Sequence, residues 1–403
     1  MSQYRIPLAY NNFGPAELAA IQKTVDTGML TQGRQVEAFE KALAEWSGAA
    51  HAIFVNSGSS ANMVGIEAMV YLSRMKPELT HGALQAGDEV ITPGLSWPTT
   101  LKPLLNQGLR PVFCDIDLKT LNATVEDIEK VRTKRTRGVV AVPVLGNPEG
   151  LDEIRAYCDA TGLVMFEDSC ESFGARTASG KNVGRVGMAS AFSFYFSHHI
   201  STIEGGAILT DSAEVADLCY ALRSHGWTRH FKLNRFEQEE KLQGIDPRFC
   251  FVLPGYNVRA TEINAAIGIE QLKRVPNFLA RRRKIAKKRI EAIASASDKA
   301  VVPGADIIDR HSWMTLPILF KDASLRERAQ KVIEAGGVET RPIIVGNVLR
   351  HPLVEWLGIK DDQIALPNCD AVFERGLMIG LNPMSSDEEE AFVADVLRKG
   401  VNA

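Results

Sequence analysis

The stretch that decides the fold is Ala191-Phe-Ser-Phe-Tyr-Phe-Ser-His-His-Ile-Ser-Thr-Ile-Glu-Gly-Gly206, in which His198 and His199 stand side by side. An apolar run leads into a polar turn, and the two glycines return the chain to a second apolar run at 207–210. This order predicts a strand, a loop and another strand. A rigid sheet would hold the loop's polar groups in place for chemistry, although adjacent histidines also occur in ordinary surface loops.

On both sides of this stretch, apolar strands rich in β-branched residues alternate with helical patterns. We predict strands at 51–56, 88–92, 110–115, 138–144 and 163–166, and helices at 125–131, 151–160 and 213–223. Such alternation indicates a mainly parallel sheet with helices on both faces. The last hundred residues, with a strand at 313–320 and a helix at 324–335, read as a separate α+β unit.

A turn of small residues, Asn56-Ser-Gly-Ser-Ser-Ala-Asn62, separates the first strand from a helical pattern. The free N–H groups and the positive dipole end of a helix start attract an anion. The small residues Gly58, Ser59 and Ser60 let a phosphate come close to the backbone. Ordinary turns have the same composition, so this signal is weak by itself.

Two acidic residues, Glu167 and Asp168, end the strand predicted at 163–166, and Glu171 follows them. Ligands of open α/β sheets bind beyond the carboxyl ends of the strands. Aspartate is also a favoured N-cap of a helix, so the residues alone leave a ligand site and a cap equally open.

Size and composition indicate an ordinary globular enzyme of 403 residues, with 45% hydrophobic residues and a formal net charge of -3. Nothing points to nucleic acid or to a membrane, since no apolar run approaches the roughly 20 residues of a span. The N-terminal residues lack a cationic and then apolar signal pattern. Six cysteines without a CxxC pair read as reduced thiols, so we expect a cytoplasmic protein.

Four separated segments resemble the sugar aminotransferases that use pyridoxal phosphate, the DegT/DnrJ/EryC1/StrS family. They are the turn at 56–62, the acidic strand end at 167–175, the stretch at 191–206 and the segment at 254–268. The resemblance covers nearly the whole chain. It implies the aspartate-aminotransferase fold (fold type I), a mixed, mainly parallel α/β sheet with helices on both faces plus a small C-terminal α+β domain.

On this basis we expect four parts. They are an N-terminal arm at 1–12, a large cofactor-binding domain at 13–260, a long connecting helix at 261–295 and a small C-terminal domain at 296–403. The basic run at 281–289 is expected to be a solvated helix face, because apolar residues recur beside it at helical spacing. An anion site is the alternative for this run.

The resemblance also implies a cofactor site for pyridoxal 5'-phosphate or pyridoxamine 5'-phosphate, with no metal. Its cofactor-binding residues would be Gly58, Ser59, Ser60, Trp97, Asp168, Glu171, Ser193 and Asn257. In the family, an aspartate at the position of Asp168 pairs with the pyridine nitrogen, and an aromatic at the position of Trp97 stacks on the ring. The asparagine that Asn257 matches reaches the phosphate of the neighbouring subunit, which implies a homodimer with shared active sites.

Three further residues are implied substrate ligands: His225, Arg229 and Arg341. Arg341 is a candidate for the diphosphate of a nucleotide sugar, and a structural arginine is the alternative at even odds, since exposed arginines are common.

The family's catalytic lysine is absent, because its position is occupied by His198 and no lysine lies between Lys181 and Lys232. An imidazole cannot keep the covalent link that a lysine amine forms with the cofactor aldehyde. It can move protons near neutral pH, which makes His198 the predicted catalytic base and acid. His198 stands five residues after Ser193, as the lysine does, which favours it over His199; a contribution of His199 stays open.

Histidine in place of lysine marks the 3-dehydratases of nucleotide sugars within this family. The resemblance implies removal of the 3-hydroxyl of a nucleotide-linked 4-keto-6-deoxy hexose, GDP-4-keto-6-deoxy-D-mannose above others, through a ketimine with pyridoxamine phosphate. L-Glutamate would donate the amine and ammonia would be released. Only Cys219 and Cys250 lie between Gly206 and Cys369, so we expect no iron-sulfur cluster. The alternatives are a nucleotide-sugar 4-aminotransferase with an unusual base, and a non-catalytic relative that binds cofactor or sugar.

Overall fold

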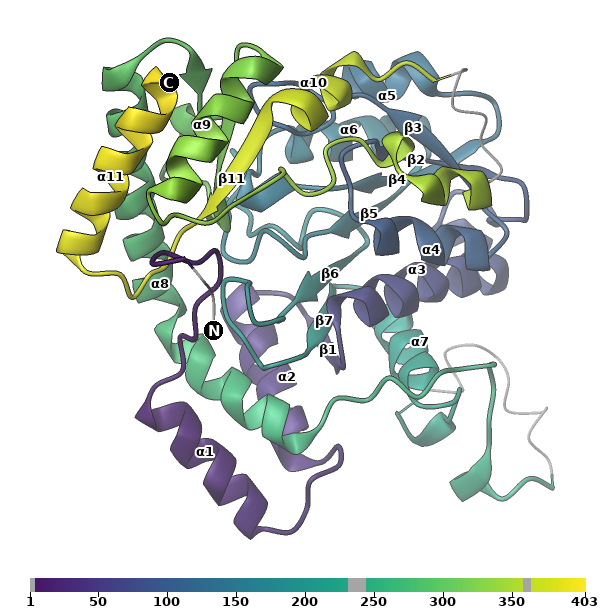
Figure 1. Ribbon diagram of the computed structural model, residues 1–403. Coiled ribbons are helices and arrows are strands. Elements are labelled where there is room, and N and C mark those ends of the chain that lie inside the picture. The colour runs from purple at the N-terminus through teal and green to yellow at the C-terminus, as the bar shows by residue number, and fades with distance from the viewer. Residues whose placement is uncertain (1–3, 231–243, 358–363) are drawn as a thin grey trace.

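The computed structural model describes residues 4–230, 244–357 and 364–403. Its larger sheet has seven strands in the order β1-β7-β6-β5-β4-β2-β3 (Figure 1). Their bounds are β1 His51–Val55, β2 Glu89–Pro93, β3 Arg110–Cys114, β4 Thr136–Ala141, β5 Val164–Asp168, β6 Ala189–Ser193 and β7 Gly206–Thr210. Only β7 runs antiparallel to its neighbours, β6 and β1, and every other pair is parallel. The expected mixed, mainly parallel sheet is confirmed.

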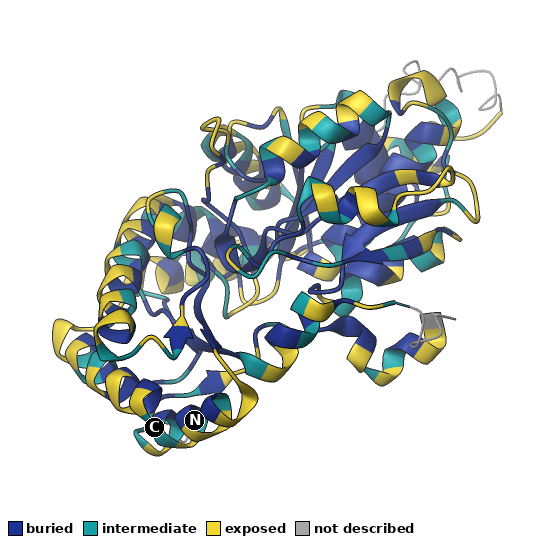
Figure 2. Cartoon of the chain, turned by 90° about the horizontal axis from the view of Figure 1, so that it is seen from above, coloured by how far each residue is buried: buried dark blue, intermediate teal, exposed yellow. Residues whose placement is uncertain are grey.

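Helices cover both faces of this sheet, because successive residues of a strand point to opposite sides. Ile53 and Val55 of β1 pack into one apolar cluster, and Ala52 and Phe54 pack into another. The first cluster contains residues of α3 (Gly58–Met75), α4 (Pro98–Asn106) and α7 (Ala213–Arg223). The other face is covered by α2 (Arg34–Ser47), α5 (Val125–Val131), α6 (Leu151–Thr161) and α8 (Glu262–Ala296). Figure 2 shows the buried strands between helices that are exposed on their outer sides.

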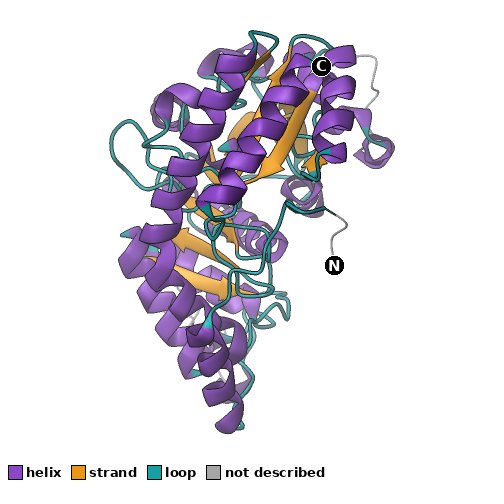
Figure 3. Cartoon of the chain, turned by 60° about the vertical axis from the view of Figure 1, so that its left-hand side comes forward, coloured by secondary structure: helices purple, strands orange, loops and turns teal. Residues whose placement is uncertain are grey.

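A second, antiparallel sheet lies near the C-terminus, in the order β10-β11-β9-β8. Its strands are β8 Ala300–Val301, β9 Thr315–Phe320, β10 Thr340–Arg341 and β11 Gly376–Gly380. The helices α9 (Ala323–Ala335) and α11 (Asp387–Asn402) pack on it around a separate apolar cluster, and α10 (Pro367–Arg375) precedes β11. Figure 3 shows the two groups of strands among their helices. The expected small α+β unit is therefore present, while the exact domain boundaries stay a prediction.

The long helix α8 ties these parts together. It contacts α1 (Pro15–Asp26) and α2 near its start and α11 towards its end. The carboxylate of Glu262 accepts hydrogen bonds from the main-chain N–H groups of Gly33, Gln35 and Val36, each at 2.9 Å. A carboxylate at the positive end of α2 satisfies N–H groups that have no partner within that helix.

Part of the basic run on α8 is buried, which corrects the expected solvated face. Arg282 is 4% exposed and Arg289 is 1% exposed, on the same side as the buried Ile285. These residues recur at helical spacing, so the apolar stripe and the two arginines share one face. Both guanidinium groups find acceptors in the interior.

None of the helices in the described ranges combines the length and the apolar character that a membrane crossing requires.

Candidate active site

Asp168 lies at the carboxyl end of β5 and is only 5% exposed. Its Oδ2 accepts hydrogen bonds from Asn62 Nδ2 at 2.8 Å and from Thr100 Oγ1 at 2.5 Å. The two donors come from α3 and α4, which both begin at this edge of the sheet. The Oδ1 atom accepts a single long bond from the Cys170 N–H at 3.4 Å, so it retains room for a further donor.

The start of α3 forms a cradle beside the end of β6. Ser57 caps the helix by accepting from the Ser60 N–H at 3.1 Å. The N–H groups of Gly58 and Ser59 have no acceptor among the described residues. A Cβ on Gly58 would lie 2.6 Å from Ser193 Cβ, so only glycine allows this approach. Free N–H groups at a helix start, with no side chain over them, fit a phosphate group.

Trp97 precedes α4 and is 54% exposed, with no aromatic partner in the described parts of the chain. The two residues after Pro98 tie this helix start to the rest of the site. Thr100 donates to Asp168, and Ser59 Oγ bonds to Thr99 Oγ1 at 2.9 Å. An open indole at this position suits a flat ring, as the sequence analysis expected.

Glu171 is a second acid of the site; it is half-buried and accepts fewer hydrogen bonds than Asp168 among the described residues. Its Oε2 accepts from the Leu145 N–H at 3.0 Å. Burial raises the pKa of Glu171 to about 7; the Leu145 bond opposes this rise and the charge of Asp168 adds to it. Glu171 can therefore hold a proton near neutral pH and donate it to a ligand oxygen.

A short loop leads from β6 to the two histidines. Ser193 Oγ accepts from the Tyr195 N–H at 3.3 Å, and the His198 N–H donates to the Tyr195 carbonyl at 3.0 Å. These two bonds connect Ser193, beside the cradle, to the turn that carries His198.

The far side of this loop is tied to α8. Gln271 accepts from the Ser201 N–H at 3.2 Å, and Asn264 Nδ2 donates to the Thr202 carbonyl at 2.6 Å. Ile203 occupies the position of the family's first glycine, and its φ of 73° lies in the left-handed region. A β-branched residue is strained there, which explains why glycine suits this position.

His198 faces a polar cavity that distant segments build. Its polar lining includes Tyr10 and Asn12 from the N-terminal segment, Arg282 from α8 and Asn382 after β11. The N-terminal segment is held there because the Leu8 N–H donates to Glu339 Oε2 at 2.8 Å. Burial lowers the pKa of His198 to about 4, and the positive charge of Arg282 acts in the same direction.

His199 is more deeply buried than His198, at 2% exposure. Neither of its ring nitrogens has a hydrogen-bond partner among the described residues. Burial holds the pKa of His199 well below its ordinary value, and the positive charge of Arg282 adds to the effect. His199 is therefore a neutral imidazole within the protein.

Hydrogen bonds and close approaches join several of the predicted cofactor residues, while four predicted residues make no hydrogen bond to the Asp168 group in the described ranges. Asn257, His225 and Arg229 are exposed, and the Arg229 guanidinium lies 3.8 Å from the centre of the Trp227 ring. Arg341 is exposed and pairs with Glu339 at 3.0 Å. No hydrogen bond joins these four to the Asp168 group in the described ranges, so their roles stay predictions.

Sequence reasoning missed the residues that hold the site in shape. The sequence does not reveal the partners of three residues that stabilise the site. Asn62 and Thr100 bond to Asp168. Thr99 bonds to Ser59. Their spacing along the chain predicts none of these contacts. Arg282 was read as part of a solvated face. The signal that could have found Arg282 is its helical register with Ile285, which placed it on the apolar side.

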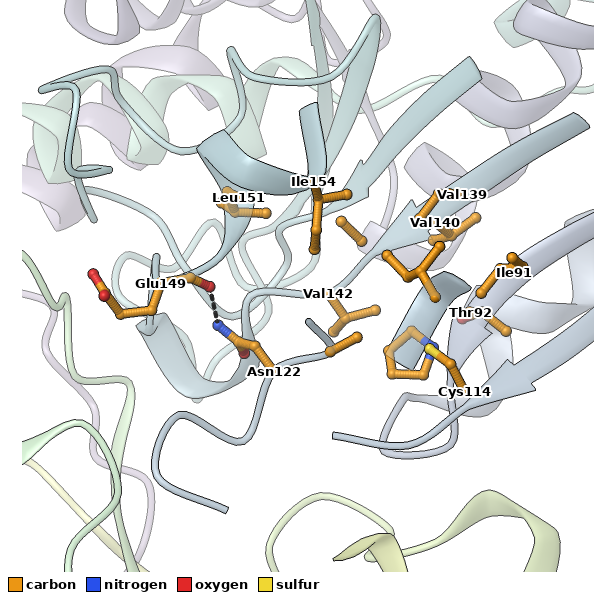
Figure 4. Close-up of a pocket in the computed structure, with 14 residues that line it drawn as sticks. Ile91, Thr92, Cys114, Asn122, Val139, Val140, Val142, Glu149, Leu151 and Ile154 are labelled. Atoms are coloured by element: carbon orange, nitrogen blue, oxygen red, sulfur yellow. Dashed lines mark hydrogen bonds between the residues drawn. The ribbon is translucent and has the colours of Figure 1, made fainter. Parts of the chain in front are cut away.

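Two other features do not add to this site. The cavity of Figure 4, between strands of the large sheet and α6, is lined mainly by apolar core residues, and its Asn122 amide donates to the Glu149 carbonyl at 2.9 Å. Within the described residues, no group of three or more His, Cys, Asp or Glu side chains is arranged to hold a metal ion. All six cysteines are free thiols.

Comparisons with known proteins agree with this arrangement. The model of the DegT/DnrJ/EryC1/StrS aminotransferase family matches residues 12–398. A curated relative, GDP-4-keto-6-deoxy-D-mannose 3-dehydratase of Yersinia pseudotuberculosis, is 38% identical over 402 residues, covering 98% of each chain.

Two solved structures are similar over the whole chain. One is GDP-4-keto-6-deoxymannose-3-dehydratase with a trapped PLP-glutamate geminal diamine, at a TM-score of 0.86 and 34% identity, covering 98% of this chain and 100% of that one. The other is a histidine-to-asparagine variant of an enzyme of the same name with bound GDP-perosamine, with the same TM-score, identity and coverage. The family resemblance and the fold class predicted from the sequence are thereby confirmed.

Proposed function

This chain belongs to the DegT/DnrJ/EryC1/StrS aminotransferase family, and we propose that it is a pyridoxal phosphate-dependent 3-dehydratase of a GDP-linked 4-keto-6-deoxy hexose. One observation carries the proposal. The site keeps the acid, the cradle and the open indole of the family, while an imidazole stands where the tethering amine is expected. Of the nucleotide sugars, GDP-4-keto-6-deoxy-D-mannose is the substrate we propose first, because two curated relatives, 38% and 35% identical to this chain, carry it in their names.

The residues present fit pyridoxal phosphate and its amine form. The two unpaired N–H groups at the start of α3 would hold the phosphate, and Trp97 would cover one face of the ring. Asp168 Oδ1 would accept from the ring nitrogen, and Glu171 would meet the ring hydroxyl. When bound, the cofactor supplies an electron sink in its protonated ring, which Asp168 keeps charged.

His198 then supplies the proton transfers. Its neutral imidazole accepts a proton at a ring nitrogen, and the imidazolium so formed gives that proton to the oxygen of the leaving 3-hydroxyl. A group with a low pKa is a weak base but yields a strong conjugate acid, and burial gives His198 a pKa of about 4. The nitrogen that L-glutamate supplied leaves when water hydrolyses the unsaturated amine product: the carbon 4–nitrogen bond breaks, the ketone forms and ammonia is released. An imidazole cannot form the covalent tether that a lysine amine forms, so His198 serves in proton transfer alone.

The overall stoichiometry balances. One L-glutamate and one 4-keto sugar give one 2-oxoglutarate, one ammonia and one 3-deoxy-4-keto sugar. Glutamate loses two electrons, and carbon 3 of the sugar gains them as its hydroxyl departs. The amine donor is supported by the related structure that holds a PLP-glutamate adduct.

We also propose a homodimer with shared sites in the cytoplasm. Asn257, His225 and Arg229 are exposed, as expected of side chains that serve a neighbouring subunit. Arg341 is the proposed contact for the sugar diphosphate. Six free thiols favour a reducing compartment.

The test is incubation with L-glutamate, cofactor and a panel of GDP-, dTDP-, UDP- and CDP-linked 4-keto sugars, read by mass spectrometry. The proposal expects a ketone that has lost one oxygen, with equal amounts of 2-oxoglutarate and ammonia, and the highest rate with the GDP sugar. An amino sugar would instead identify a 4-aminotransferase. Binding without turnover of any sugar would identify a non-catalytic relative.

A further inference from the structure

A buried cation lies beside His198 without a counter-ion. Arg282 is 4% exposed and lines the same cavity as His198. Its Nη1 donates to the carbonyls of Trp313 at 3.2 Å and of Met314 and Leu381 at 2.8 Å each. Its Nε is buried with no partner, and no carboxylate of the described residues forms an ion pair with it. The positive charge is therefore fixed in place but not neutralised.

The three carbonyls come from two separate segments, one leading into β9 and the other following β11. Carbonyl oxygens satisfy donors, but they carry only partial charge. A guanidinium held by carbonyls alone keeps its field in the surrounding interior, where charges interact over longer distances than in water. Nearby groups that can become cationic feel this field most.

The other groups around His198 carry no opposing charge. The N-terminal segment contributes Tyr10, whose pKa burial raises to about 12, so the phenol stays neutral. The loop itself contributes His199, which burial keeps neutral. The remaining residues that line the cavity, Met314 and Asn382 among them, are apolar or uncharged and do not titrate. Arg282 is thus the charged side chain that faces His198 within the described ranges.

We propose that Arg282 is a positioning residue that acts through His198, holding its imidazole neutral before the reaction and making its protonated form a strong acid towards the leaving hydroxyl. The catalytic purpose of this effect rests on the proposed function, whereas the effect itself is tested by the titration of His198 without any turnover. The same charge lowers the pKa of both neighbouring imidazoles, in the direction that the proposal requires.

The test is a titration of the imidazoles in the full, cofactor-free chain by NMR, with histidine labelled at Cε1. The chain has eight histidines, and the signal of His198 is assigned by its loss in His198→Asn. The variants are Arg282→Gln and Arg282→Met, which remove the charge, and Arg282→Lys, which keeps it. The matched control is Arg281→Gln, which removes a neighbouring charge that bonds to Asp387 and Ser385 outside the cavity.

We expect the midpoint of His198 to rise by about one pH unit when the charge of Arg282 is removed. Arg282→Lys and Arg281→Gln should leave it within a few tenths of a unit. An unchanged midpoint in a folded Arg282→Gln or Arg282→Met protein would overturn the inference, and so would an equal rise in the lysine variant or the control.

One outcome needs no variant of Arg282. A midpoint at or above the ordinary value of about 6.5 in the unmodified chain would also overturn it. Failure here leaves the proposed function intact, because no turnover is measured. Conversely, absence of a dehydrated product would leave the titration result standing.

Discussion

Two buried arginines on the same helix show how differently the small C-terminal unit and the active site use charge. Arg282 and Arg289 are seven residues apart on α8, about two helical turns or roughly 10 Å. Arg289 forms a two-point ion pair with Glu390, with both N···O distances 2.8 Å, and also donates to the Gly380 carbonyl at 2.6 Å. Arg282 has carbonyl partners alone and two imidazoles nearby.

The difference follows from what each environment must do. Next to Arg289, Glu390 is 2% exposed and also accepts from Ser385 Oγ at 2.5 Å, so the two charges of this buried pair balance one another. Such a pair fixes β11 and α11 against α8. Next to Arg282, a carboxylate would cancel the field that acts on His198. The charge of Arg282 is therefore unpaired beside His198, where we propose that a proton moves, whereas the charge of Arg289 is paired where it joins α8 to β11 and α11.

The largest expected effect is at His198 itself. His198→Asn should lower dehydration by at least about 10³-fold, because in the proposed reaction one imidazole serves as both base and acid. The thermal midpoint should change by no more than a few degrees. Product formation is measured by mass spectrometry and unfolding by circular dichroism.

The control for that variant is His81→Asn, the same substitution on an exposed turn where the φ of 55° suits asparagine. It should behave as the unmodified protein does. Undiminished turnover in His198→Asn would reject the role assigned to this imidazole.

Breaking the ion pair between Arg289 and Glu390 should lower the stability of the fold and leave the rate of the reaction nearly unchanged. Arg289→Met leaves Glu390 buried without its partner, so the free energy of unfolding should fall by about 3–5 kcal/mol. The activity per folded molecule should stay within about twofold. The double variant Arg289→Met with Glu390→Leu should recover most of the loss in urea unfolding experiments. A loss below about 1 kcal/mol in the single variant would contradict the account of this pair.

Glu171 offers a test by pH, since it is a half-buried acid with no ion-pair partner among the described residues. Its folded pKa of about 7 lies above the ordinary 4.5, so the folded state binds the proton more tightly than the unfolded state. This stabilising contribution is present below about pH 4.5 and is lost as the pH rises to about 7.

Glu171→Gln removes that dependence. In the cofactor-free chain, we expect its stability relative to the unmodified protein to improve by about 2 kcal/mol between pH 5 and pH 8. Urea unfolding at several pH values measures the difference. If the stability of the two proteins changed with pH in the same way, the pKa of Glu171 would not be raised in the folded state.

The smallest effect is expected at Arg281, which precedes Arg282 on this helix. Arg281 pairs with Asp387 near the surface, and Asp387 is 69% exposed. Arg281→Gln should change the free energy of unfolding by no more than about 1 kcal/mol and leave turnover unaltered. A larger loss of stability would contradict our inference that the exposed ion pair of Arg281 contributes less to stability than the buried ion pair of Arg289.

Local patterns predicted the regular elements well and failed where a single residue interrupts them. The helices expected at 125–131 and 213–223 have these bounds in the structure. The strand expected at 138–144 ends at Ala141 instead, because Pro143 lacks an N–H and the chain then turns through Leu145 at a φ of 52°. That turn brings the Leu145 N–H to Glu171, so the interruption belongs to the site.

The layered α/β fold, the family and the presence of His198 at the position of the family's lysine could all be predicted from the sequence. Apolar periodicity and short motifs depend on residues that are close along the chain, which is why the sequence reveals them. The sequence did not determine that Asn62 and Thr100, 106 and 68 residues before Asp168, would meet at one carboxylate. Nor did it show that Arg282 lies buried beside His198 while Arg289 finds Glu390. These contacts join segments that are distant along the chain, so they depend on how whole helices and sheets pack. Residue spacing in the sequence does not specify that packing, and the contacts became visible in the tertiary structure.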